Sequence, residues 1–314
     1  MRTVLSITAL VLLTSCTLGE PLSQDQSIYL FSSFRGNGED GLHLAYSRDG
    51  LTWTALKDDK SFLKPMVAGK LMRDPCIIQG PDGTFHMVWT TSWTDQGIGI
   101  AHSTDLIDWS EQTFIPVMEH QSTARNCWAP EITWDPDGKQ YVIYWATTIP
   151  ERFPETAKNA DRGWNHRMYC TTTKDFKDYT ETRLFCNPGF NVIDSTITKH
   201  HNQYIMVLKD ETRFPPAKNL RIARSDRVTG PWSETSKAFT PRGLWVEGPT
   251  VLKVNESCIV YYDAYRKHEY GAMRTTNFSE WEDISGRISF PRGTRHGTAL
   301  SVSDSIFGKL LEQK

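Results

Sequence analysis

The sequence predicts an all-β fold, a five-bladed β-propeller, and two observations lead to this prediction. First, a short turn pattern recurs along the 314-residue chain: a Ser or Thr, then an Asp or Asn, then an aromatic residue. Second, a run of β-prone residues precedes each copy, and no long helical periodicity follows the first twenty residues. A pattern that returns about every fifty residues is typical of propeller blades, each built from four strands.

The turn pattern has five copies. They begin at Ser47, Ser103, Thr173, Ser225 and Thr275 and end at Trp53, Trp109, Tyr179, Trp232 and Trp281. Asp, Asn, Ser and Thr side chains hydrogen-bond the backbone just beyond them in turns. We therefore expect each copy to close one strand and to pack its aromatic ring back on the blade.

The β-prone runs supply the second strand of each blade. They cover residues 27–32, 85–90, 140–145, 203–208 and 258–263. Hairpin turns such as Pro81-Asp82-Gly83 precede two of them. Each unit then reads as inner strand, hairpin, second strand, third strand, turn and outer strand.

The two ends of the chain predict how the ring closes. The run from residue 27 has no inner strand ahead of it, and the last inner strand, 295–302, is followed only by a short tail. If the N-terminal strands pair with this last inner strand, two exposed sheet edges disappear. Residues 27–314 are thus predicted to be one propeller domain, and we expect a monomer.

The N-terminus predicts export. Residues 1–15 contain a short basic start and an apolar stretch too short to span a bilayer, and Leu13-Thr14-Ser15-Cys16 resembles a bacterial lipobox. This predicts a lipoprotein signal peptide, lipidation of Cys16, a tether over 16–26, and a protein anchored in the periplasm or at the cell surface. The alternative is an ordinary signal peptide with a chance cysteine.

Charge and cysteine content exclude some functions. The net charge of -2, with 23% charged residues, gives no field that would attract nucleic acid. The five cysteines after Cys16 show no metal-binding spacing. Cys170 and Cys186 could pair across a hairpin, which the sequence leaves open.

Three carboxylates stand at the starts of inner strands: Asp74, Asp194 and Glu247. Because these starts ring one end of the central channel, Asp74 and Glu247 should face each other, with Asp194 beside Glu247. Two carboxylates across a gap suit glycoside hydrolysis, and a third negative charge would keep its neighbour protonated. The alternative is that each carboxylate only accepts backbone N–H bonds in its turn.

A set of motifs in fixed order resembles the blade entries of glycoside hydrolase family 43, over essentially the whole chain from about residue 27. They are Arg73-Asp74-Pro75, Trp128-Ala129-Pro130-Glu131, Ile193-Asp194-Ser195, Glu247-Gly248-Pro249 and Arg295-His296-Gly297-Thr298. The resemblance implies an inverting reaction with Asp74 as general base, Glu247 as general acid, and Asp194 as the group that raises the pKa of the acid and orients substrate. The chain departs from the family in placing its leading strands in the last blade, and in having Glu131 where Asp is common, so Glu131 receives no catalytic role.

Seven residues near these starts are predicted to contact substrate. They are Arg73, Trp93, Asn126, Trp128, Lys209, Arg295 and His296. The Trp rings would stack on sugars, and the amide and cations would bind hydroxyls or orient the acids. The resemblance implies that His296 lies near the axis, beside a structural calcium or sodium ion in many members; no cofactor is required. The long segment from Ile149 to His166 would narrow the opening and favour exo action.

The resulting hypothesis is an exo-acting α-L-arabinofuranosidase that removes terminal sugars from plant oligo- or polysaccharides. A β-xylosidase or a galactofuranosidase of the same family is the alternative. A sialidase shares the propeller and the turn, but its arginine cluster and tyrosine nucleophile find no place at these strand starts. The remaining alternative is a lipid-anchored, non-catalytic sugar-binding propeller.

Overall fold

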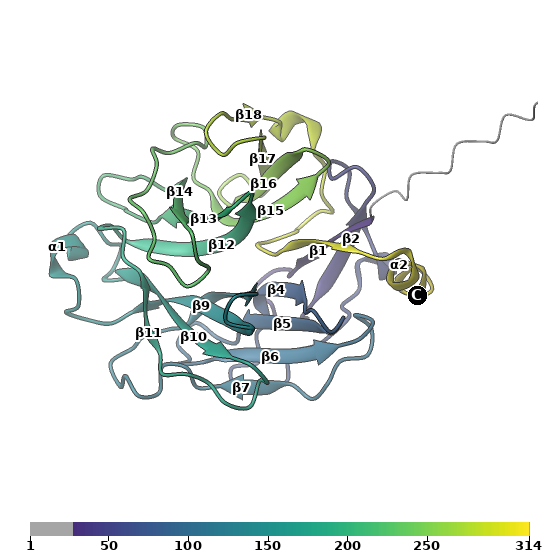
Figure 1. The fold of residues 1–314 in the computed structure, drawn as a ribbon, viewed down its shortest axis with the longest axis horizontal. Coiled ribbons are helices and arrows are strands. Elements are labelled where there is room, and N and C mark those ends of the chain that lie inside the picture. The colour runs from purple at the N-terminus through teal and green to yellow at the C-terminus, as the bar shows by residue number, and fades with distance from the viewer. Residues whose placement is uncertain (1–27, 314) are drawn as a thin grey trace, which may run out of the picture.

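The computed structural model describes residues 28–313, and its strands form five sheets arranged around a common axis (Figure 1). The predicted signal peptide at 1–15, Cys16 and the whole of the tether lie outside these residues. No helix within 28–313 is long and apolar enough to cross a membrane. The prediction of an all-β, five-bladed propeller is confirmed.

We name the sheets blades A to E in the order of their inner strands. Blade A holds β4 (Arg73–Gln79), β5 (Phe85–Thr90), β6 (Ile98–Ser103) and β7 (Thr113–Ile115), and blade B holds β8 (Trp128–Asp135), β9 (Gln140–Thr148), β10 (His166–Thr173) and β11 (Arg183–Cys186). Blade C holds β12 (Val192–His200), β13 (Gln203–Asp210) and β14 (Asn219–Ser225). Blade D holds β15 (Glu247–Val254), β16 (Ser257–Ala264), β17 (Glu269–Thr275) and β18 (Glu282–Asp283), and blade E holds β19 (Ala299–Val302), β1 (Ile28–Ser33), β2 (His43–Ser47) and β3 (Thr54–Ala55). The helices are short: η1 (Lys57–Asp59), α1 (Pro154–Ala157), η2 (Ser285–Arg287) and α2 (Asp304–Leu311).

Blade E joins the two ends of the chain as predicted. Strand β1 pairs with β19 in an antiparallel ladder that places Leu30 opposite Leu300. Beyond the ladder, Ser32 and Thr298 exchange two backbone hydrogen bonds of 2.9 and 3.2 Å. The Ser32 hydroxyl also donates to the Pro75 carbonyl of blade A at 2.6 Å, so the joined blade is tied to its neighbour.

The C-terminal tail is a helix, which the sequence analysis did not predict. Ser303 caps α2 by accepting a hydrogen bond from the Ile306 amide. Phe307 and Leu310 are buried in the cluster that also contains Leu44 of β2. The helix therefore covers apolar surface of blade E, beside β1 and β2 in Figure 1.

The hydrophobic core is divided into five clusters, one between each pair of neighbouring blades. Between blades B and C, for example, Tyr144 packs with Met206. Each blade thus buries apolar side chains on both of its faces, and removing a blade would expose two neighbours. This mutual packing holds the starts of the inner strands in a fixed ring.

The repeated turn is confirmed in four of its five copies. In the copy at Ser47, the Ser hydroxyl accepts from the Gly50 amide at 2.9 Å, and Asp49 Oδ1 accepts from the Leu51 and Thr52 amides at 2.7 and 2.9 Å. The copies at Ser103, Thr173 and Thr275 repeat these contacts. In the fifth copy the Ser225 hydroxyl accepts only from the Arg227 amide.

The prediction of four strands in every blade is wrong for blade C. The segment after Trp232 runs along β14. Its backbone amides donate hydrogen bonds to the strand at every third residue, whereas a β-strand would do so at every second. On the edge of β14 that faces away from β13, hydroxyls satisfy the backbone amides: Ser233, Ser236 and Thr240 accept from Arg224, Ile222 and Leu220 at 3.0, 3.1 and 3.2 Å. These side chains take over the acceptor role of an outer strand.

All five cysteines within the described residues are buried free thiols. Cys186 lies opposite Met168, and Cys170 lies opposite Arg183, so the ladder between β10 and β11 does not place the two cysteines face to face. The pairing that the sequence left open is therefore absent from this structure.

Candidate active site

The same backbone feature marks the start of four inner strands. At Asp74, Ala129, Asp194 and Gly248 the chain has a positive φ of 53°, 46°, 49° and 56°, and the strand register shifts there by a bulge. A bulge breaks the simple alternation of side chains and bends the strand. We call the end of the ring where these bulges lie the mouth.

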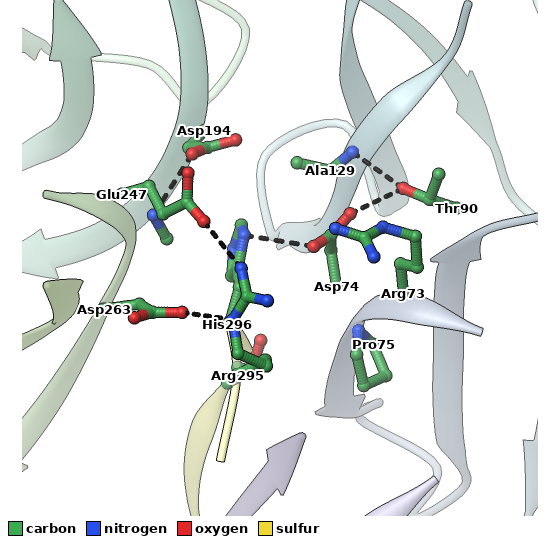
Figure 2. Close-up of polar contacts among 12 residues, drawn as sticks. Arg73, Asp74, Pro75, Thr90, Ala129, Asp194, Glu247, Asp263, Arg295 and His296 are labelled. Carbon is green, nitrogen blue, oxygen red and sulfur yellow. Dashed lines mark hydrogen bonds and ion pairs between the residues drawn. The ribbon is translucent and has the colours of Figure 1, made fainter. Parts of the chain in front are cut away.

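This repeat corrects the predicted equivalence of the three carboxylates. Asp74 and Asp194 occupy the bulge position itself, whereas Glu247 stands one residue before the bulge, at the position of Arg73 in blade A. Even so, Figure 2 shows the three carboxyl groups converging, with Asp194 and Glu247 on one side of His296 and Asp74 on the other.

Asp74 is held as an anion. Its Oδ1 lies 3.4 Å from Nδ1 of His296, and its Oδ2 accepts from the Thr90 hydroxyl at 2.8 Å. Burial by itself would raise the pKa of Asp74, but the hydrogen bond and charge of His296, with Arg73 and Thr90, lower it to about 2. The Thr90 hydroxyl in turn accepts from the Ala129 amide at 2.9 Å, which fixes the carboxylate against blade B (Figure 2).

His296 lies between the carboxylates. Burial disfavours its protonation, but Asp74, Asp194 and Glu131 outweigh this effect and raise the pKa of His296 to about 9. Its ring lies in space that only a glycine could leave open, because a Cβ on Gly248 would be 2.4 Å from the imidazole Cγ. Gly248 therefore leaves the space that the His296 ring occupies.

Asp194 and Lys209 form a buried charged contact beside Glu247. Asp194 Oδ2 accepts from the Gly248 amide at 3.2 Å and lies 3.9 Å from Nζ of Lys209. Burial, which Lys209 and His296 only partly oppose, raises the pKa of Asp194 to about 6, with the negative charge of Glu247 contributing. A carboxyl with this pKa can hold a proton in mildly acidic solution.

Glu247 is the most exposed of the three carboxylates, with 22% of its side chain accessible. Lys209 donates to its Oε2 at 3.3 Å, and Arg295 donates to its Oε1 at 3.2 Å. Arg295 also donates to Asp263 at 2.8 Å, and burial followed by the charge of Glu247 raises the pKa of Asp263 to about 6. Arg295 is thus shared between two carboxylates, as Figure 2 shows.

Aromatic rings gather on the blade A and B side of the mouth. Trp93, 47% exposed, meets the ring of Trp128 edge-on at 5.5 Å, and Trp128 Nε1 donates to the Trp93 carbonyl at 3.0 Å. Trp164, from the long segment between β9 and β10, lies 4.6 Å from Trp128. Arg73 lies over the Trp93 ring at 4.3 Å, and its guanidinium donates to Asn37 Oδ1 at 3.2 Å.

Asn126 is the predicted contact that the structure contradicts. Its side chain is fully buried: Nδ2 donates to the Ala146 carbonyl at 3.1 Å, and Oδ1 accepts from the Thr148 amide at 3.0 Å. The amide therefore fixes the loop ahead of β8 and is not accessible to a sugar. Lys209 is also buried, and its contacts are with carboxylates, so it orients acids rather than faces solvent.

Sequence reasoning missed Thr90, Asp263, Trp164 and also Glu211, which lies 2.7 Å from Nζ of Lys209. A usable signal existed for Thr90 and Asp263, because the second strand of each blade runs antiparallel to the inner strand and must end at the mouth. The ladders place Arg73 opposite Thr90, Ile193 opposite Lys209 and Glu247 opposite Asp263. Polar residues at the ends of second strands are therefore candidates for the site, as are polar residues at the starts of inner strands.

The predicted metal ligand His296 has its Nδ1 3.4 Å from Oδ1 of Asp74. Within residues 28–313 no group of three His, Cys, Asp or Glu side chains is arranged to hold a metal ion. A structural cation near the axis stays a prediction of the sequence.

Comparisons with known proteins identify the family. Residues 25–306 match the glycoside hydrolase family 43-related model described as "Probable glycosyl hydrolase domain". A curated α-L-arabinofuranosidase of Bifidobacterium longum subsp. longum is 24% identical over 185 residues, which are 51% of this chain but only 17% of that protein.

Solved structures share the fold. An α-L-arabinofuranosidase from Lactobacillus brevis superposes with a TM-score of 0.50 and 20% identity, covering 68% of this chain and 72% of that one. An exo-β-1,3-galactanase from Phanerochaete chrysosporium gives a TM-score of 0.51 and 14% identity, covering 67% of this chain and 49% of that one. The family match spans nearly the whole described chain, and it includes every carboxylate that meets at the mouth. The chain belongs to this family of glycoside hydrolases related to family 43.

Proposed function

We propose that the protein removes terminal α-L-arabinofuranosyl residues from plant-type oligo- or polysaccharides with inversion at the anomeric carbon. The observation that carries the proposal is the placement of Asp74 and Glu247 on non-neighbouring blades, A and D, with His296 between them. Two carboxyl groups on opposite sides of a sugar, with room for a water, suit inversion.

In this proposal Asp74 is the general base. Its pKa near 2 keeps it ionised at neutral pH, so it can take a proton from the water that attacks the anomeric carbon. As the new C–O bond forms, the glycosidic C–O bond breaks, and the leaving oxygen takes a proton from Glu247. Arg295 and Lys209 hold Glu247 in place, and Asp194 adds negative charge beside it.

The choice of arabinofuranose rests on relatives, since the curated match and one of the structural neighbours are α-L-arabinofuranosidases. Exo action is supported by the segment between β9 and β10, which places Trp164 against Trp128 at the mouth. A β-xylosidase and a galactofuranosidase are the competing assignments within the family.

A panel of aryl glycosides (α-L-arabinofuranoside, β-xyloside and β-galactofuranoside) with NMR detection of the first product anomer tests the proposal. We expect the arabinofuranoside to be cleaved fastest and the anomeric configuration to be inverted. Retention would overturn the mechanism, and faster cleavage of another glycoside would overturn the substrate.

The roles of the carboxylates are tested by Asp74→Asn and Glu247→Gln. Each should lower kcat by about 10²–10⁴-fold, the usual contribution of a general base or acid. The matched controls are Asp108→Asn and Glu256→Gln, which change exposed carboxylates outside the mouth. The two controls should unfold like the unmodified protein, and both site variants should keep its circular dichroism spectrum, although Asp74→Asn should unfold at a lower temperature because it breaks the pair with His296. Normal turnover in either site variant would refute its assignment.

A further inference from the structure

A cationic and aromatic cluster lies on the Glu247 side of the mouth. We call it the Trp245 cluster: Trp245, Tyr265, Arg213, Lys218 and Arg266. Around the Trp245 ring lie Arg266 Cζ at 3.8 Å, Arg213 Cζ at 4.9 Å and Lys218 Nζ at 5.5 Å. The Tyr265 ring lies 6.4 Å from it. The members come from the loop between β13 and β14, the loop between β16 and β17, and the segment just before β15.

Continuous contacts join this cluster to Glu247. Trp245 precedes Glu247 by two residues in the chain. Lys209 donates to Glu247 at 3.3 Å, lies 2.7 Å from Glu211, and sits 5.0 Å from the Tyr265 ring. Glu211 in turn pairs with Lys218. The cluster is therefore the immediate neighbour of the proposed acid, on the flank of blades C and D.

Two cations of the cluster have no anionic partner. Among the ion pairs of residues 28–313, Lys218 is paired with Glu211, but none includes Arg213 or Arg266, and neither guanidinium donates a hydrogen bond there. Arg266 is exposed and Arg213 is half-buried. An arginine stacked on an aromatic face is held in orientation while the N–H groups in its plane remain free to bind a planar anion.

The other cations at the mouth are already engaged. Arg73 bonds Asn37, and Arg295 is divided between Asp263 and Glu247. The guanidinium groups of Arg213 and Arg266, which donate no hydrogen bond, therefore lie on the Glu247 side of the mouth. A group released by protonation must lie on this side, because the acid has to reach the leaving oxygen.

We propose that the Trp245 cluster is a leaving-group subsite for an acidic sugar, one that carries a carboxylate or a sulfate ester next to the bond that is cut. This inference rests on the proposed function, since it takes Glu247 as the proton donor. Arg213 and Arg266 bind the anionic group, and Trp245 with Tyr265 hold their guanidinium planes and offer apolar surface to the sugar ring.

The test uses three disaccharides with the terminal sugar that the aryl panel selects, linked to glucose, to glucuronate or to glucose 6-sulfate. We expect kcat/KM for an acidic disaccharide to exceed that for the neutral one by about tenfold, the effect of one charge-assisted hydrogen bond. The preference should shrink at high salt. The glucuronate and sulfate arms show which anion is bound.

The variants are Arg213→Gln and Arg266→Gln, each expected to reduce the ratio of acidic to neutral kcat/KM toward one. The matched control is Arg227→Gln, an exposed arginine of the same blade C at the turn after β14, away from the mouth, which should keep the ratio. Equal rates for acidic and neutral substrates in the unmodified protein, or a preference that survives in both cluster variants, would overturn the subsite.

A binding measurement separates this inference from the reaction. Calorimetric titration of Glu247→Gln with the glucuronate and glucose disaccharides should show tighter binding of the acidic one, and a second substitution, Arg266→Gln, should abolish the difference. If the unmodified protein cleaves none of the disaccharides while this difference is present, the hydrolytic function fails and the subsite stands. Equal affinity for the two disaccharides would refute the subsite and leave the hydrolytic function unaffected.

Discussion

The ion pair of His296 with Asp74 sets a defined pH window. Asp74 has its pKa lowered from 3.8 to about 2, so the stability it contributes is present above about pH 4 and is lost as the pH falls towards 2. His296 has its pKa raised from 6.5 to about 9, so its contribution is complete below pH 6.5 and is lost as the pH rises through 9. The pair therefore stabilises the fold most between these limits.

Replacing His296 by Gln should move the pH dependence of catalysis. Without the imidazolium, buried Asp74 loses its main cation, and its pKa should rise by roughly 1–3 units. The acidic limb of the kcat/KM profile should shift upward by a similar amount, with lower activity at mildly acidic pH. His120→Gln, which changes an exposed histidine, is the control. An unmoved acidic limb would contradict the role of Asp74 as base.

Lys209 neutralises carboxylates that would otherwise repel one another. Substituting Lys209→Met should lower the free energy of unfolding at pH 7 by about 3–5 kcal/mol, because buried charges lose their partner. The loss should be smaller at pH 5, since Asp194, whose pKa is raised to about 6, is then protonated. Urea unfolding at the two pH values measures this, with exposed Lys199→Met as control. A loss that does not depend on pH would count against the charge explanation.

At the residue scale the sequence predicted which carboxylates meet, because spacing by whole blades places strand starts in one ring. It did not predict that Glu247 stands one position before Asp74 and Asp194, because the motifs were aligned by their carboxylates rather than by Pro75, Pro130 and Pro249, which follow the bulge residue in blades A, B and D. Asn126 was misassigned for a related reason. Its two backbone partners, Ala146 and Thr148, lie about twenty residues away and are brought near only by the pairing of β8 with β9.

At the scale of elements, the repeated turn is a local device whose strength can be measured. Asp49 accepts from two backbone amides and from the Ser47 hydroxyl, so Asp49→Ala should lower the free energy of unfolding by about 1–2 kcal/mol. Asp226, in the copy where no such bonds form, is the matched control, and Asp226→Ala should cost less than about 0.5 kcal/mol. Equal losses in chemical denaturation would refute this ranking of the turns.

The same comparison explains why blade C was predicted with four strands. Its turn has the Ser, Asp and Trp of the other copies but contains Gly230-Pro231, and proline has no amide for a ladder. The hydroxyls that replace the outer strand are spaced by three and four residues, so they lack the alternation by which a strand is recognised in a sequence. Their function is apparent only once they lie against β14.

At the scale of the whole molecule, the ring is closed by one contact region, the pairing of β1 with β19. A substitution in this region can disrupt the closure selectively. A Cβ on Gly297 would lie 1.7 Å from the Ser32 carbonyl oxygen, where the chain ends meet. Gly297→Ala should therefore lower the free energy of unfolding by about 1–3 kcal/mol or more, by forcing β19 from β1. Gly286→Ala is the control, because a Cβ there has nothing within 4 Å. If both variants unfold at the same temperature, the close approach is not what holds the ring.

The closure itself was predictable from the two ends of the propeller domain. The first β-prone run has no inner strand before it, and the last inner strand has no β-prone run after it, so the two complete one blade. Helix α2 was not predictable, since its eight residues are too few to show a periodicity. It is stabilised by the packing of Phe307 and Leu310 against the apolar surface of blade E, which the sequence does not reveal.

The bulge at the mouth separates the architecture of this ring from its chemistry. The backbone has the same left-handed residue in four blades, yet the residue there is Asp, Ala, Asp or Gly. Blades A, B and C therefore share a backbone position that carries different side chains on the same bulge, whereas Gly248 in blade D has no room for a side chain beside His296. Ala129 occupies this position in blade B, between Asp74 and Asp194 in the order of blades, and its side chain is a single methyl group. It is therefore the position at which to introduce a new reactive side chain by substitution.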